Sequence, residues 1–275
     1  MSKKLHYLNV NGIAESIRYI LHYGGQKFED IRYELSDWPI KSVKDSLPYG
    51  QLPLYQEGSK TLNQSLAIAR YVASQVKLLP TDPWEQAVLD AIVFNIYDFW
   101  SSKSYISLCP IQKFMVFRKK VNSSNKNVTF DTDTSNPNRF YIYSLTLAYV
   151  LYCIKKHKFK IFLNNNIIFL FAEIVTFIKE TDATRKEAIK KEIINESVDF
   201  FFSRFEKELK ANKGYFNGKV NYWADFILVG IVESANLFLG TEIEKKYPSV
   251  TALVKTVRSL PGVKDYLATR KPYTL

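Results

Sequence analysis

The sequence lacks several features that would assign a function class at once. It has only 2 cysteines, Cys109 and Cys153, and both lie in the stretch 102–172. The rest of the chain therefore has neither a disulfide framework nor a CxxC metal or redox motif. The opening residues, MSKKLHYLNV, lack the apolar run and the small-residue cleavage pattern of a secretory signal. We therefore expect a cytoplasmic protein.

Long apolar runs are also missing. The strongest candidate is the fifteen-residue run 140–154, FYIYSLTLAYVLYCI, which Lys155 and Lys156 follow. This run is shorter than the roughly 20 residues that a membrane-spanning helix needs. We expect no membrane partner, although a peripheral role for this segment stays open.

Acidic residues are scarce in one segment only. The formal net charge is +11, but residues 102–172 carry 11 Lys and Arg against 2 Asp. The remaining residues include 27 basic and 25 acidic side chains and are therefore nearly neutral. Outside 102–172 the chain lacks the basic excess that is typical of nucleic-acid binding. We expect no nucleic-acid partner.

The pattern that is present predicts a small α/β domain followed by helices. Residues 4–10 and 28–34 favour strands, and the apolar spacing within 14–24 predicts a helix that ends at Gly24-Gly25. A hairpin around Glu57-Gly58-Ser59 and a helix from Ser65 complete the order βαβ then ββα. After a proline-bearing linker at 79–83, helices are predicted at 84–100, 174–213 and 223–239.

Several segments follow one another along the chain in a distinctive order: KLHYLNV-GIAESIRYIL, DWP, LPYGQLPLY, TLNQSLAIARYV and DAIVFNIYDF. They resemble the glutathione transferases, and the sigma class in particular, and the resemblance spans 3–101 and 174–272. It implies a fold of the class α/β plus all-α, with a thioredoxin-like glutathione-binding domain (βαβ-ββα) at 1–79 and an α-helical C-terminal domain at 80–275, interrupted at 102–172.

The resemblance implies that the protein conjugates reduced glutathione to small hydrophobic electrophiles, as in detoxification. Glutathione would be a co-substrate, and no cofactor is implied. A glutathione-dependent isomerase of the prostaglandin D synthase kind is an alternative. A non-catalytic, crystallin-like relative is another, since fold does not fix function.

The resemblance places the catalytic tyrosine at Tyr7, near the end of the first strand. A free thiol with a pKa of about 8.5 is mostly protonated at neutral pH, whereas a neutral phenol that donates a hydrogen bond stabilises the thiolate. Tyr7 would therefore act as a donor and not as a base. The other interpretation is that Tyr7 is one of 18 tyrosines and merely packs on a strand.

The resemblance also implies a set of glutathione-binding residues around a cis-proline. Pro53 matches this cis-proline, which leaves the backbone of Leu52 free to pair with the cysteinyl main chain of glutathione as an added strand. Pro53 could instead simply begin a strand. Besides Tyr7, the implied residues are Trp38, Lys44, Gly50, Gln51, Leu52, Pro53, Gln64, Ser65 and Asp98.

Two pairs within this set are implied to bind the carboxylates of glutathione. Gln64 and Ser65 stand where a helix begins, and its free N–H groups and dipole favour the γ-glutamyl carboxylate. Helix capping would explain Ser65 equally well. Trp38 and Lys44 would contact the glycyl end with a ring edge and a cation, or would be surface residues.

Asp98 matches an acidic residue that, in the family, reaches across a twofold dimer to the γ-glutamyl ammonium. The resemblance therefore implies a homodimer, although Asp98 could also be a solvated carboxylate. Ile13 stands where some sigma enzymes carry an arginine near the thiolate. Phe94 and Tyr97 stand at positions that are acidic in vertebrate prostaglandin D synthases, so we expect no metal site.

A capping box is also implied before the helix at 223–239. The segment Asn221-Tyr222-Trp223-Ala224-Asp225 resembles it, with Tyr222 where Ser or Thr is usual. We expect Asn221 to cap this helix instead, with Asp225 in its first turn.

The stretch 102–172 interrupts a join that is continuous in the family. It is rich in Lys, Asn, Phe, Ile and Tyr and has no sustained helical period. Ser102-Lys103-Ser104 can be encoded with the splice-donor string GTAAGT, and Ala172-Glu173 with an acceptor CAG. We hypothesise that the segment is a translated, unspliced intron. Its removal would give a shorter protein, here called the spliced form, in which DFWS is followed by KIVTFIKE.

Overall fold

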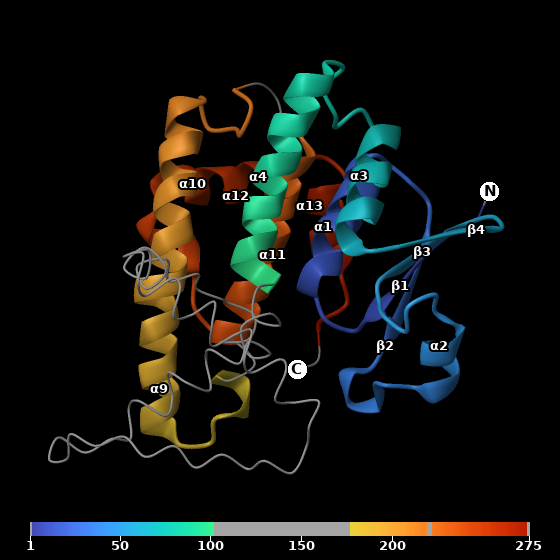
Figure 1. Cartoon of the computed structure of the whole chain (residues 1–275), viewed down its shortest axis with the longest axis horizontal. Helices are drawn as coiled ribbons and strands as arrows, with labels where there is room; N and C mark the ends of the chain where they lie inside the picture. The colour runs from blue at the N-terminus through green and yellow to red at the C-terminus, as the bar shows by residue number, and fades with distance from the viewer. Residues whose placement is uncertain (1, 102–176, 219–221, 274–275) are drawn as a thin grey trace, which may run out of the picture. The chain divides into compact units, whose positions relative to one another are not determined.

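The computed structural model describes residues 2–101, 177–218 and 222–273 (Figure 1). The chain divides into two units, one of residues 1–102 with 169–275 and the other of residues 103–168. All described residues belong to the first unit. The proposed intron at 102–172 and the apolar run 140–154 therefore lie outside the described residues.

Four strands form one mixed sheet in the order β2-β1-β3-β4. β1 is parallel to β2 and antiparallel to β3, and β3 is antiparallel to β4. This arrangement confirms the predicted α/β class of the N-terminal half. The strands are β1 (Lys3–Leu8), β2 (Glu29–Tyr33), β3 (Leu54–Glu57) and β4 (Lys60–Asn63).

The alternation of side chains along β1 distinguishes the two faces of the sheet. Leu5 joins a core with residues of α1 (Glu15–Tyr23) and α3 (Ser65–Gln75), such as Ile20 and Ile68. His6 points to the opposite face, where a cavity is lined by His6 and by residues of α2 (Lys41–Ser46). Helices thus flank the sheet on both faces (Figure 1). Because side chains alternate along a strand, Tyr7 lies on the same face as Leu5.

The described part of the C-terminal half is helical, which confirms the predicted all-α class. The apolar helix α11 is buried along most of its length and packs against both α1 and α4. The helices are α4 (Pro83–Ser101), α9 (Ala183–Glu192), the π-helical segment η3 (Ile193–Val198), α10 (Asp199–Ala211), α11 (Trp223–Leu239), α12 (Pro248–Ser259) and α13 (Val263–Thr269).

The predicted helix at 174–213 is not continuous in its described part. A helical turn at 177–179 ends before Glu180, whose side chain accepts the N–H groups of Thr181 and Asp182, each at 2.9 Å. Asp182 in turn caps α9 by accepting the N–H of Arg185 at 2.8 Å. These side chains compete with the backbone for N–H groups, so they break the helix. The expectation of one unbroken helix was wrong.

The N-cap of α11 is Tyr222, and not Asn221, which lies outside the described residues. The Asp225 carboxylate accepts the backbone N–H of Tyr222 at 3.0 Å and that of Phe216 at 3.3 Å. Asp225 therefore supplies its half of a capping box, as its first-turn position predicts.

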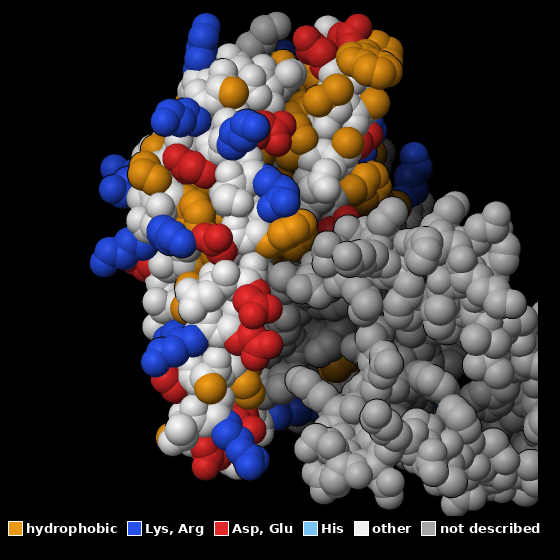
Figure 2. All heavy atoms as spheres, turned by 60° about the vertical axis from the view of Figure 1, so that its left-hand side comes forward, with side chains coloured by type: hydrophobic (Ala, Val, Ile, Leu, Met, Phe, Trp, Pro, Cys, Tyr) orange, Lys and Arg blue, Asp and Glu red, His pale blue; other side chains and the backbone are white. Residues whose placement is uncertain are grey.

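The surface over α9 and α10 carries both signs of charge. Figure 2 shows basic and acidic side chains interspersed on this face. Within the described ranges, no helix is long and apolar enough to span a bilayer.

Candidate functional site

The strand register brings several of the predicted site residues to one end of the sheet. His6 of β1 is opposite Leu54 of β3, and Leu54 is opposite Asn63 of β4. The residues that come next along β1 and β4, and those that precede β3, therefore lie at the same end. They are Tyr7, Leu52-Pro53 and Gln64-Ser65.

Tyr7 is nearly enclosed at this end, with 9% of its surface exposed. It packs with Val10 and Ala14, and Ile13 and Leu52 lie alongside this group. The Leu52–Pro53 peptide bond is cis, as the resemblance implies, and so is Trp38–Pro39, which the sequence analysis did not expect.

Gly12 lies directly against the Tyr7 hydroxyl. Its φ is +48°, and a Cβ at this position would be 2.6 Å from the Tyr7 Oη atom. Only glycine combines this conformation with this little space. The Gly12 carbonyl accepts a hydrogen bond of 2.9 Å from the Ser234 Oγ of α11. The turn that meets the phenol is thus held by a helix from the other half of the molecule.

The electrostatic environment keeps the Tyr7 phenol protonated. Burial raises the pKa of Tyr7 to about 12, although Arg18 and the backbone N–H of Ile13 act in the opposite direction. The guanidinium carbon of Arg18 is 5.8 Å from the centre of the Tyr7 ring. At physiological pH the hydroxyl is therefore neutral and has a proton to donate.

Gln64 has an unusual backbone conformation. Its φ is 71° and its ψ is 115°, and it is the N-cap residue of α3 without a side-chain capping bond. A left-handed conformation at a non-glycine residue costs on the order of 1–3 kcal/mol and is concentrated at functional sites. Ser65 is the buried first residue of the helix and does not occupy the N-cap, so capping does not explain it.

The remaining N-terminal candidates lie around α2. Trp38 is half-buried, and its ring centre is 6.3 Å from that of Tyr33 at the end of β2. Lys44 is exposed in the last turn of α2 and runs along Gly50, where a Cβ would be 3.4 Å from the Lys44 Cε atom. Gln51 is exposed. In the described part of the chain, the group that packs around Tyr7 includes neither Trp38 nor Lys44.

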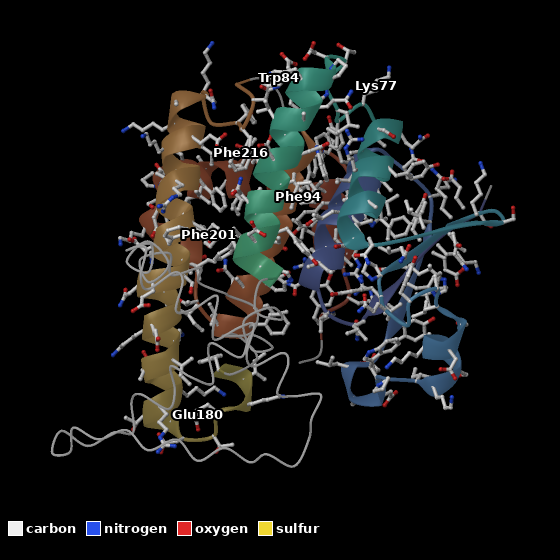
Figure 3. All side chains as sticks on the ribbon, in the orientation of Figure 1. Lys77, Trp84, Phe94, Glu180, Phe201 and Phe216 are labelled. Carbon is white, nitrogen blue, oxygen red and sulfur yellow. The ribbon has the colours of Figure 1, made fainter. Side chains whose placement is uncertain are left out.

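Asp98 lies on α4, and most of its side chain is exposed. The neighbouring groups partly desolvate its carboxyl, which raises the pKa of that carboxyl. The same helix exposes large apolar side chains, Trp84 at 78% and Phe94 at 60%, which project from the ribbon in Figure 3. The preceding residue of α4, Tyr97, is close enough to Tyr7 to contribute to its raised pKa.

A cavity of about 340 Å³ lies on the other face of the sheet. It is lined by His6, Tyr33 and Gln56 of the sheet and by Val43 of α2, and it does not include Tyr7. Of the residues with described side chains, no group of three or more His, Cys, Asp or Glu is placed to hold a metal ion.

A buried polar network next to Tyr7 was not predicted from the sequence. Glu15 and Arg18 of α1 are both fully buried and form an ion pair of 3.1 Å. Arg18 also pairs with Asp30 of β2 at 3.0 Å, and Glu15 pairs with Arg270 at 2.6 Å. In the sequence, Glu15 and Arg18 resemble an ordinary surface pair at helical spacing, and no local signal shows that they are buried.

Two family models match the chain. One, described as the N-terminal domain of glutathione S-transferase, matches residues 3–74. The other, described as the C-terminal domain of glutathione S-transferase, matches residues 170–270.

Some known proteins resemble nearly the whole chain at low identity, and others resemble part of it at higher identity. A "Glutathione S-transferase" of Anopheles gambiae is 24% identical over 267 residues, which cover 97% of this chain and 96% of that protein. The "Hematopoietic prostaglandin D synthase" of Homo sapiens is 37% identical over 131 residues, or 48% of this chain and 65% of that protein. Its Rattus norvegicus counterpart is 45% identical over 98 residues, or 36% of this chain and 48% of that protein, so the rat protein is the shorter of the two.

A solved structure also matches. The "Structure of prostaglandin synthase D of Nilaparvata lugens" has 26% sequence identity and a TM-score of 0.63, and the match covers 99% of this chain and 100% of that one.

Proposed function

The chain belongs to the glutathione S-transferase family and is a glutathione transferase, and we propose that it conjugates reduced glutathione to small hydrophobic electrophiles. In this proposal Tyr7 donates a hydrogen bond to the glutathione sulfur and stabilises the thiolate, which then attacks the electrophile. The observation that carries the proposal is a protonated phenol held at the end of the sheet beside Leu52.

The size of the expected effect suits this role. A hydrogen bond to a charged group contributes about 1.5–3 kcal/mol. That energy corresponds to a decrease of about one to two units in the thiol pKa, which brings a free-thiol pKa of about 8.5 close to neutral. The thiol proton leaves to solvent, and the Tyr7 proton stays on the phenol because its own pKa is far higher.

The rest of glutathione would lie along the same end of the sheet. The Leu52 backbone would pair with the cysteinyl main chain, next to Gly50 and Gln51 in the loop before β3. Gln64 and Ser65 at the start of α3 would hold the γ-glutamyl carboxylate, and Trp38 and Lys44 the glycyl carboxylate. The strained backbone of Gln64 and the α3 terminus without a side-chain cap support the γ-glutamyl assignment. The α-helical half would supply the apolar pocket for the electrophile.

A homodimer is part of the proposal, with Asp98 of one copy reaching the γ-glutamyl ammonium bound to the other. The exposed Trp84 and Phe94 on the same helix support a protein contact at this face. The fold itself leaves the assembly open, since a neighbour of 25% identity and TM-score 0.64 is described as a monomeric glutathione S-transferase of Necator americanus. Sedimentation equilibrium should give twice the chain mass, and a single-chain mass would refute this part.

A glutathione-dependent isomerase is the second candidate. It is supported by the 37% identity over 131 residues to the human hematopoietic prostaglandin D synthase. Turnover of a prostaglandin endoperoxide compared with that of an aromatic halide would distinguish the two activities.

Steady-state kinetics of wild type and Tyr7→Phe with glutathione and a generic aromatic halide would test the proposal. We expect turnover to fall about 10- to 100-fold, because the lost hydrogen bond contributes about 1.5–3 kcal/mol. Affinity for glutathione should change little. Tyr71→Phe is the matched control, since Tyr71 is a tyrosine of α3 whose hydroxyl donates to Glu57 at 2.7 Å. Equal turnover in Tyr7→Phe and wild type would overturn the role of Tyr7.

A further inference from the structure

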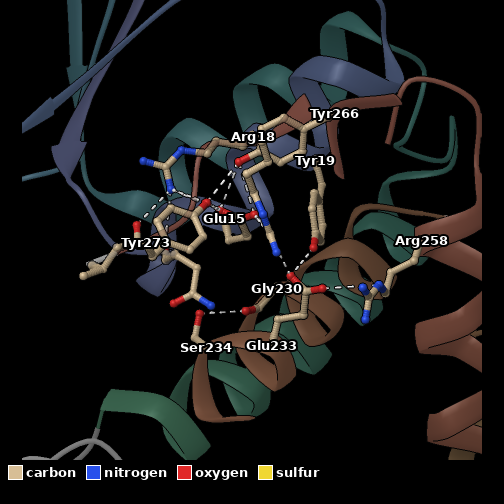
Figure 4. A network of polar contacts seen from close by, with 12 residues as sticks. Glu15, Arg18, Tyr19, Gly230, Glu233, Ser234, Arg258, Tyr266 and Tyr273 are labelled. Atoms are coloured by element: carbon tan, nitrogen blue, oxygen red, sulfur yellow. Dashed lines mark hydrogen bonds and ion pairs between the residues drawn. The ribbon is translucent and has the colours of Figure 1, made fainter. Parts of the chain in front are cut away.

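The chain segment after α13 returns to the buried network behind Tyr7. Arg270 donates to Glu15 at 2.6 Å and to Glu233 of α11 at 3.1 Å. Tyr273 donates its hydroxyl proton to the other carboxylate oxygen of Glu15. This segment is here called the tail (Arg270–Tyr273), and Figure 4 shows its Tyr273 beside Glu15 of α1.

Arg18 links the tail to the catalytic tyrosine. Its guanidinium carbon is 5.8 Å from the ring centre of Tyr7 and also 5.8 Å from that of Tyr273. Its Nη1 atom donates to the Tyr273 hydroxyl at 3.5 Å, and its buried Nη2 atom has no hydrogen-bond partner in the described part of the chain. Arg18 therefore lies between two tyrosine rings, where its charge interacts with both.

The positive charge of Arg18 acts on the phenol of Tyr7. A cation near the ring draws electron density from the hydroxyl, so the phenol becomes a stronger hydrogen-bond donor. Burial works against this effect and is the larger influence on the pKa of Tyr7. Glu15 and Asp30 pair with Arg18 and offset its charge. When other partners share these carboxylates, more of the Arg18 charge acts on the Tyr7 phenol.

The tail provides such partners for Glu15. The Glu15 carboxylate is shared between Arg18, Arg270, Tyr266 and Tyr273. Without the tail, the Glu15 carboxylate would keep only Arg18 and the Tyr266 hydroxyl of α13 as partners, and its pairing with Arg18 would be stronger. The charged and titratable groups that face Arg18 or its partners come from β1, α1, β2, α11, α13 and the tail, and they are Tyr7, Glu15, Tyr19, His22, Asp30, Arg32, Glu233, Tyr266, Arg270 and Tyr273.

We propose that the tail, through Tyr273 and Arg270, is a positioning element of the active site that weakens the pairing of Glu15 with Arg18 and keeps Arg18 against the Tyr7 ring. This inference rests on the proposed role of Tyr7 as the donor to glutathione. In this inference the positive charge that favours the thiolate comes from Arg18 and acts through the Tyr7 ring. The chain has Ile13 at the position where some sigma enzymes carry an arginine near the thiolate. Arg18, Arg270 and Tyr273 are positioning residues, because they act through Tyr7.

The test is the pH profile of kcat/KM for conjugation of an aromatic halide, measured on wild type, Tyr273→Phe and Arg270→Lys. In Tyr273→Phe the thiol should ionise less readily, so we expect the acidic limb of kcat/KM to move to higher pH. The value of kcat/KM should fall about three- to tenfold at pH 6.5 and match that of wild type in alkaline buffer. The KM for glutathione should stay the same. Arg270→Lys keeps the charge and should shift the limb less than Tyr273→Phe does.

The control is Tyr247→Phe, which removes a tyrosine hydroxyl that donates to Asp199 at 2.7 Å in the α-helical half. Its acidic limb should match that of wild type. A melting temperature lowered in Tyr273→Phe with an unmoved limb would show a purely structural role and overturn the inference. A wild-type limb that is not below the pKa of free glutathione, or one that Tyr7→Phe leaves in place, would instead refute the proposed role of Tyr7.

Discussion

At the scale of single residues, the position of the Tyr7 hydroxyl depends on the absence of a side chain at Gly12. Gly12 has no Cβ, and its turn therefore approaches the phenol more closely than any other residue type would allow. Ser234 fixes this turn through the Gly12 carbonyl. The hydroxyl is thus held by packing, and a displacement of about 1 Å at a reacting group can cost about 100-fold in rate.

Gly12→Ala should therefore separate activity from stability. A Cβ at Gly12 would be 2.6 Å from Tyr7 Oη, so the phenol must move, and we expect turnover to fall by at least about tenfold. Gly25→Ala is the control, because Gly25 also has a positive φ, +61°, but has nothing within 4 Å of the added atom. The left-handed backbone alone should cost each variant about 1–2 kcal/mol of stability, and Gly12→Ala should lose more because of the contact with Tyr7. Full turnover in Gly12→Ala would contradict this account of the turn.

At the scale of elements, α11 holds the two halves of the molecule together. Gly230 permits close contact with α1, since a Cβ there would be 2.4 Å from Ser16 Oγ and 2.7 Å from Ser16 N. The start of the same helix is fixed by Asp225, which is almost fully buried and bonds two backbone N–H groups. The helix that carries Ser234 to the Tyr7 turn is therefore anchored at its N-terminus by one carboxyl group.

Asp225 should give the protein a distinctive pH dependence of stability. Burial raises the pKa of Asp225 to about 7, whereas the unfolded value is about 3.9. Between these values the folded state binds more protons than the unfolded state. The stabilisation from the protonated carboxyl is thus complete below about pH 4 and is lost as the pH rises through 7, at up to about 1.4 kcal/mol per pH unit.

Chemical denaturation of wild type and Asp225→Asn across this range would measure the effect. The variant is neutral throughout, so the free energy of unfolding of wild type minus that of the variant should decrease from pH 4 to pH 7. A difference that stays constant or increases would show that the carboxyl is ionised in the folded protein.

The elements that could be predicted from the sequence are those with a clear period. The alternation at β1 and the 3.6-residue spacing of α1 predicted these two elements close to where the structure has them. The short helix α2, by contrast, is too brief to show a period, and local side-chain bonds at Glu180 and Asp182 override the helical pattern. The pairing of Glu15 with Arg270 joins residues 255 apart, and no local pattern encodes such a contact.

At the scale of the whole molecule, the segment 102–172 is the unusual feature. The residues that flank it, Phe99 and Trp100 before it and Phe177 after it, belong to one hydrophobic core. A relative from Rattus norvegicus is shorter than this chain. Both observations support the proposal that the segment is a retained intron and that α4 is followed by a short join in the spliced form.

The spliced form should be more soluble and more stable than the full chain. We expect a higher soluble yield and a higher melting temperature than for the 275-residue chain, because a long insertion in a packed helical region exposes apolar surface during folding. Parallel expression of both forms, with the Tyr7→Phe variant of each as a matched inactive control, would measure this. Equal yield and equal activity would refute the prediction, and recovery of only the 275-codon transcript would end the intron hypothesis.

The most direct test of the central claim is an ultraviolet titration of glutathione bound to wild type and to Tyr7→Phe, in which the absorbance of the thiolate is followed against pH. If the Tyr7 hydroxyl stabilises the thiolate, the bound thiol of wild type should ionise about one to two pH units below the free value of about 8.5. In Tyr7→Phe the midpoint should return close to that free value, with glutathione still bound. The same midpoint in both proteins would contradict the account.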